Sequence, residues 1–113
     1  MEMAEETRRV SAAARLALGQ WSQRVGEGGM AAMAVSPGLL ALVDQHAAVV
    51  RDAVADRHGR VPLASLAAYA DGLADAAAAR GWSLRELDDD GWNRASSVSV
   101  RLLAICVLAS SQA

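Results

Sequence analysis

Apolar side chains recur along most of the chain at intervals of three and four residues, the spacing that places them on one face of an α-helix. No segment shows the convincing alternation of apolar and polar residues that a strand requires. The pattern predicts four long helices, at about residues 2–24, 37–58, 62–80 and 92–110, with a short helical turn at about 30–35. We therefore predict an all-α fold, a compact bundle of four main helices plus one or two short helical turns.

Capping residues and glycines set the predicted helix boundaries. Ser36 is suited to cap a helix that begins at Pro37, and Gly59 and Gly81 are placed to end the second and third helices. Three glycines among residues 26–29 cost a helix much backbone entropy, so we expect the first helix to end there in a flexible loop. The length of 113 residues predicts a single helical domain, residues 1–113.

The last predicted helix is apolar on almost every side. Such a helix belongs either in the middle of a bundle or at a contact between subunits, so a homodimer is a second expectation. Its most apolar run, Leu102 to Ala109, is eight residues long, whereas a bilayer needs roughly 20. The run therefore predicts protein core and no membrane partner. Cys106, the one cysteine, is expected to be a small buried hydrophobic residue.

Charge narrows the classes of partner. The formal net charge is -2, and the arginines are dispersed among acids, so no basic face for a phosphate backbone is expected and nucleic acid is a poor candidate. The first six residues carry three glutamates and no basic residue, the reverse of a secretory signal. We expect a cytoplasmic protein.

His46 is the first candidate for chemistry. It lies on a helical stripe whose other members are apolar: Leu39, Val43, Val50 and Ala53. An imidazole in such a place is either a hydrogen-bonded core residue or part of a site, and the structural interpretation is the more common. Catalysis would need a polar partner that orients the ring as a general base.

The polar groups available to His46 lie on the third and fourth predicted helices. They are Tyr69, Asp71, Asp75 and Arg101. Spacing alone does not show whether they converge on the imidazole. Arg101 interrupts an apolar helix, and such an arginine either extends to the surface or pairs with a buried carboxylate or an anionic ligand.

Metal and cofactor sites are not predicted. His46 and His58 are twelve residues apart on one predicted helix, about 18 Å, so they cannot share an ion. The acidic run at 86–91 resembles half of a calcium loop, but Ser97 stands where the bidentate glutamate should be. Trp21, Trp82 and Trp92 could line a pocket, although filling the ends of the bundle is the more common use of such rings.

Four stretches carry a resemblance to a known family. They are Leu39–His46 (Leu-Leu-Ala-Leu-Val-Asp-Gln-His), Leu66–Ala70 (Leu-Ala-Ala-Tyr-Ala), Arg80–Trp82 (Arg-Gly-Trp) and Val100–Cys106 (Val-Arg-Leu-Leu-Ala-Ile-Cys). The chain resembles, over roughly residues 10–109, a family of small bacterial proteins known as natural-product biosynthesis proteins from the gene clusters that encode them. The resemblance implies a helical cytoplasmic protein of secondary metabolism, and it transfers no catalytic residue.

Three functional hypotheses follow. In the first, the protein is an accessory or binding partner of a biosynthetic enzyme or carrier protein. In the second, it is a small cofactor-free enzyme of the isomerase, cyclase or hydrolase type, with His46 as general base and Arg101 or Tyr69 stabilising charge in an apolar pocket that also holds a small apolar ligand. The third, a DNA-binding regulator using residues 83–101 as a helix-turn-helix, is disfavoured because acids balance the arginines there.

Overall fold

The computed structural model describes residues 2–82 and 97–111, with side chains described for residues 12–25, 28–82 and 97–110. The described residues form α-helices and one π-helical segment, without a strand. These elements are α1 (Glu2–Trp21), η1 (Ser22–Gly26), α2 (Glu27–Val35), α3 (Pro37–Val54), α4 (Leu63–Ala78) and α5 (Ser97–Ser111). The predicted all-α class is confirmed, with four long helices and the short α2.

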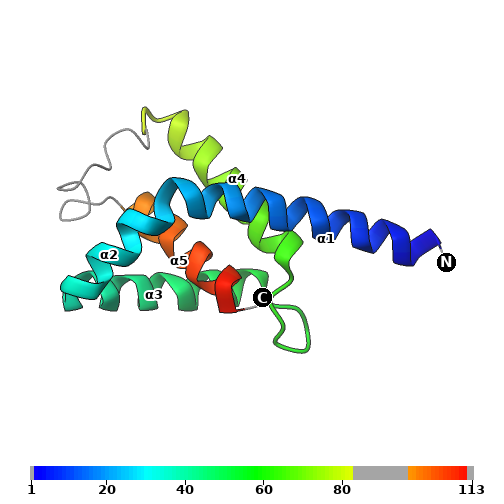
Figure 1. The fold of residues 1–113 in the computed structure, drawn as a ribbon, viewed down its shortest axis with the longest axis horizontal. Coiled ribbons are helices and arrows are strands. Elements are labelled where there is room, and N and C mark those ends of the chain that lie inside the picture. Colours follow the sequence, from blue (N-terminus) through cyan, green and yellow to red (C-terminus); the bar gives the residue numbers. More distant parts are fainter. Residues whose placement is uncertain (1, 83–96, 112–113) are drawn as a thin grey trace.

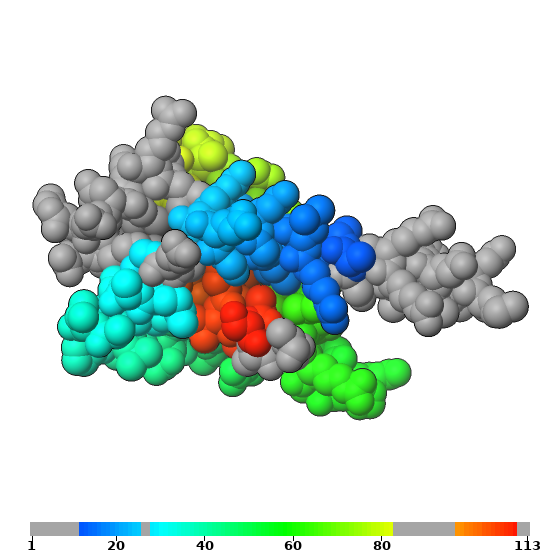
Figure 2. Space-filling view, in the orientation of Figure 1, coloured from blue at the N-terminus to red at the C-terminus, as the bar shows by residue number. Residues whose placement is uncertain are grey.

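The helices are arranged around α5. Helix α5 lies between α1 and α3 in Figure 1, and α4 crosses α1 at a steep angle. The most extensive packing joins α3 to α5 and α1 to α4. Figure 2 shows α5, in orange and red, in the space between the blue α1 and the green and cyan α3 and α2. The molecule measures 50 × 27 × 22 Å, because the N-terminal end of α1 extends beyond the other helices.

Helix α5 is buried on almost every side by helices of its own chain. Leu102, Leu103 and Ile105 have no exposed surface, and they form one hydrophobic cluster with residues of α1, α3 and α4. Burial of an apolar side chain contributes about 1.5–3 kcal/mol, so this helix dominates the core. Of the two places predicted for this helix, the middle of the bundle and a subunit contact, the described residues show the first.

The predicted loop at residues 26–29 is wrong. The chain stays helical from Glu2 to Val35, and the π segment η1 carries it into α2 without a break. Each of the three glycines costs a helix about 1 kcal/mol relative to alanine, about 3 kcal/mol together. Burial of Val25 and Trp21 in the core, at about 1.5–3 kcal/mol for each side chain, offsets that cost. The wider π turn marks the place where helical geometry adjusts to this packing.

Helix α3 begins where predicted and ends four residues early. The Ser36 hydroxyl accepts a hydrogen bond from the backbone N–H of Leu39 at 3.2 Å, which confirms the predicted cap. The helix ends at Val54 rather than residue 58, because the Asp56 carboxylate accepts hydrogen bonds from the backbone N–H groups of residues 58 and 60. Gly59, with φ of +74°, therefore belongs to this turn and does not end the helix.

The end of α4 confirms the role predicted for Gly81. Helix α4 covers Leu63–Ala78, within two residues of the prediction. The N–H of Trp82 donates to the carbonyl of Ala77, and the N–H of Gly81 donates to that of Ala78. This pair of bonds is the Schellman motif, which needs a left-handed residue, and Gly81 has φ of +93°. Residues 83–96, which include the acidic run and the predicted start of the last helix, lie outside the described residues.

Candidate functional site: a polar cluster joining three helices

His46 lies at the edge of the buried face of α3. Leu39, Val43 and Val50 on the same stripe are buried, as predicted, and His46 itself is partly buried. Ala53 is exposed, contrary to the prediction, and Val54 packs against the core in its place. The imidazole is therefore at the border between core and solvent and not inside the core.

Arg101 joins His46 to Tyr69. Its Nε donates a hydrogen bond to His46 Nδ1 at 3.1 Å, and its Nη1 donates to Tyr69 Oη at 3.2 Å. The three residues come from α3, α4 and α5, and we call them the three-helix cluster. From the sequence, we expected Arg101 either to extend to the surface or to pair with a buried carboxylate or an anionic ligand. Its partners are instead the imidazole of His46 and the phenol of Tyr69.

The geometry of the three-helix cluster fixes the protonation of His46. A guanidinium only donates hydrogen bonds, so His46 Nδ1 must be the acceptor and the ring proton sits on Nε2. Burial, and then the positive charge of Arg101, lower the pKa of His46 below its usual value. The neutral ring therefore has its one basic lone pair directed at Arg101, and that lone pair is not free to accept a proton from a substrate.

Asp71 and Asp75 lie away from His46. They are two and six residues beyond Tyr69 on α4, so they project from other faces of that helix. Asp71 instead accepts a hydrogen bond from Trp21 Nε1 at 3.0 Å. Both acids line an open hollow of about 480 Å³ together with Trp21 and Trp82. Of the four polar candidates, the structure thus brings Arg101 to His46 directly and links Tyr69 to it through Arg101.

The two described tryptophans are held by specific contacts. The Trp82 Nε1 donates to the Ser99 hydroxyl at 3.3 Å, and the Arg24 guanidinium carbon lies 5.3 Å from the centre of the Trp21 ring. Both rings border the hollow and also contact the core. Each therefore lines a hollow and fills space in the bundle, the two uses that the sequence left open. Trp92 lies outside the described residues.

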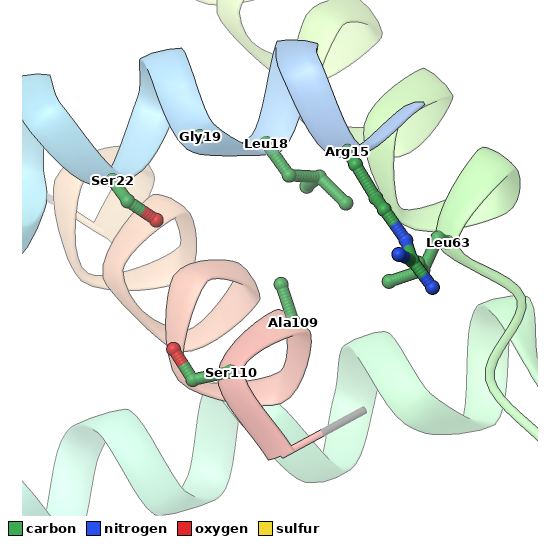
Figure 3. Close-up of a pocket in the computed structure, with 7 residues that line it drawn as sticks. All are labelled: Arg15, Leu18, Gly19, Ser22, Leu63, Ala109 and Ser110. Carbon is green, nitrogen blue, oxygen red and sulfur yellow. The ribbon is translucent and has the colours of Figure 1, made fainter. Parts of the chain in front are cut away.

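A second pocket contains none of the predicted site residues. It has a volume of about 290 Å³ and lies between α1 with η1, the start of α4 and the end of α5 (Figure 3). Its lining consists of Arg15, Leu18, Gly19, Ser22, Leu63, Ala109 and Ser110. The sequence signal was weak: residues 15, 18, 19 and 22 have the spacing of one helix face, but no motif marks them.

Cys106 is buried, as predicted. Burial raises the pKa of its thiol, and a hydrogen bond with the Ser22 side chain lowers it by a smaller amount. The sulfur therefore stays a thiol at neutral pH, which makes it a poor nucleophile. Among the described residues, no group of three His, Cys, Asp or Glu side chains is arranged to hold a metal ion.

Fold and site together define a small all-helical protein whose partly exposed polar cluster clamps three helices. Residues 37–113 match a family of unknown function, DUF6401, and the chain belongs to that family. Searches of curated proteins and of solved structures gave no match. In the described part of the chain, no single helix is both long and apolar enough to cross a bilayer; Gly28–Val35 and α3 reach that length only as a pair bent by 120°.

Proposed function

We propose that this protein is an accessory or binding protein of bacterial natural-product biosynthesis, acting beside a biosynthetic enzyme or carrier protein and not as a catalyst. The pathway rests on the sequence resemblance at Leu39–His46, Leu66–Ala70, Arg80–Trp82 and Val100–Cys106. One observation favours binding over catalysis: the hydrogen bond from Arg101 Nε to His46 Nδ1.

That bond works against the enzyme alternative. A general base needs a free lone pair within reach of the proton it removes. The basic nitrogen of His46 already accepts a hydrogen bond from Arg101. The bond therefore supports a role for His46 in joining the three helices.

Gene deletion followed by complementation separates the two functions. Deletion is expected to lower the yield of the product of the gene cluster, and the wild-type chain should restore it. His46→Asn should restore it as well, because an asparagine oxygen can accept from Arg101 while no imidazole remains to act as a base. His46→Leu serves as the matched variant that removes the acceptor too.

Two results would contradict this proposal. If deletion leaves the metabolites unchanged, the pathway assignment is wrong. If folded His46→Asn behaves like the deletion, His46 is catalytic and the enzyme alternative holds. Affinity capture with each enzyme and carrier protein of the cluster tests the partner, and failure with all of them would count against an accessory role.

A further inference from the structure

The pocket between α1, α4 and α5 is apolar in the middle and polar at its two ends. Leu18 and Ala109 face each other across it, and the Arg15 side chain extends past Leu63 at one end (Figure 3). The hydroxyl-bearing side chains of Ser22 and Ser110 lie at the other end. This division suits a ligand with an apolar body and one charged head.

The guanidinium of Arg15 is the charged group at its end of the pocket. Arg15 is exposed, and within residues 12–25, 28–82 and 97–110 no carboxylate forms an ion pair with it. A guanidinium offers parallel N–H donors that match the two oxygens of a carboxylate. The head group expected there is therefore an anion.

The opposite end of the pocket is shaped by the π segment. Ser22 is the first residue of η1, and its side chain is hydrogen-bonded to the Cys106 side chain of α5. Single π turns occur frequently at functional sites, because the wider turn redirects side chains that an α-helix would place elsewhere. The helical irregularity and the pocket thus coincide.

We propose that this pocket binds a small monocarboxylate with a short apolar chain, its carboxylate at Arg15 and its chain between Leu18, Leu63 and Ala109. The volume of about 290 Å³ is at the lower end for ligand pockets, which favours a ligand smaller than most drugs. The inference gives a ligand class to the binding role proposed above and rests on that role for its biological purpose.

Gly19 provides a way to close the pocket without disturbing the fold. It lines the pocket from within α1, and a Cβ built there meets no atom within 4 Å. Gly19→Met adds a flexible side chain at this place and replaces a poor helix former by a good one. Gly72 on α4 also has open space at its Cβ and does not line the pocket, so Gly72→Met is the matched control.

The experiment titrates the full chain with hexanoate, acetate and hexanol and follows backbone amide shifts by NMR. Hexanoate should bind saturably, with shifts at the pocket residues, and acetate and hexanol should each bind about tenfold or more weakly, a loss of about 1.4 kcal/mol. Gly19→Met should abolish hexanoate binding, whereas Gly72→Met should retain it. Arg15→Gln should reduce hexanoate binding to the level of hexanol, whereas Arg51→Gln, on exposed α3 surface, should not.

The proposal is overturned if hexanoate gives no saturable shift, if hexanol binds as well as hexanoate, or if folded Gly19→Met still binds. Circular dichroism of each variant confirms that a loss of binding is not a loss of fold. Because the titration uses purified protein, it can fail while the deletion phenotype stands, and the reverse result is equally distinguishable.

Discussion

The helices before and after Ser36 are specified in different ways. Local signals set the boundaries of α3 and α4: Ser36 caps the start of α3, Asp56 forms the turn after it, and Gly81 ends α4. Residues 2–35 stay helical, although the three glycines among residues 26–29 are the strongest helix-breaking feature of the chain. Local chemistry decides the boundaries in one region, and burial against α5 decides them in the other.

The two candidate sites also differ in which of these regions they use. The three-helix cluster lies wholly within residues 37–113, the part that matches the family. The pocket takes Arg15, Leu18, Gly19 and Ser22 from the preceding helices and its remaining lining from α4 and α5. The family region therefore supplies every residue of the cluster, whereas a ligand in the pocket would contact both regions.

The largest expected effect tests whether the two regions unfold together. Ile105→Ala in α5 and Leu18→Ala in α1 each remove a side chain that is at most 3% exposed, so each should lower the free energy of unfolding by about 2–5 kcal/mol. Leu16→Ala, at 67% exposure, should change it by less than about 0.5 kcal/mol. Urea denaturation followed by circular dichroism measures all three. Two separate transitions, with Leu18→Ala affecting one alone, would show that α1 and α2 form an independent unit.

Glycine substitutions should have opposite signs at a left-handed helix end and inside a helix. Gly81→Ala forces a Cβ into left-handed backbone and should cost about 1–2 kcal/mol. Gly28→Ala, at an exposed position inside α2, should raise the free energy of unfolding by about 0.5–1 kcal/mol, as should Gly72→Ala in α4. Thermal unfolding of the three variants tests this. If Gly28→Ala gives no gain while Gly72→Ala does, residues 26–29 behave as the loop that the sequence suggested.

The sequence was a good guide to the fold and a partial guide to the sites. Helix periodicity predicted α1, α3 and α4 because each has one apolar face, and the lack of a polar face predicted the central place of α5. It failed at residues 26–29, where propensities of about 1 kcal/mol compete with core burial that no local pattern reveals. The turn at Asp56 was missed because a side chain that caps two backbone N–H groups leaves no periodic signal.

For the candidate sites, the sequence showed which residues are unusual and did not show which of them lie close together. His46 and Arg101 stood out as polar residues in apolar stripes, and they do meet. Asp71 was considered with Tyr69 because both are polar groups on the third predicted helix, yet a separation of two residues places them about 200° apart around α4. The pocket joins side chains from distant segments, so its apolar lining was indistinguishable from ordinary core before the helices were placed.

The smallest expected effect concerns the pH dependence that His46 gives to the family region. Because the pKa of His46 is lowered on folding, the unfolded chain binds more protons than the folded chain between that lowered value and about 6.5, the usual value. Stability from this source is complete above about pH 7 and is lost as the pH falls through that window, because the imidazolium would be partly buried and would face the positive charge of Arg101. His46→Asn keeps an acceptor for Arg101 and removes the titrating imidazole. Its free energy of unfolding should therefore fall less than that of the wild type between about pH 7.5 and about pH 5.5, a range that brackets the usual histidine pKa of about 6.5. His58 and all the carboxylates are common to both chains and cancel in the comparison. Parallel pH profiles would mean that in solution His46 is neither buried nor held beside Arg101, and the main argument against His46 as a base would be lost.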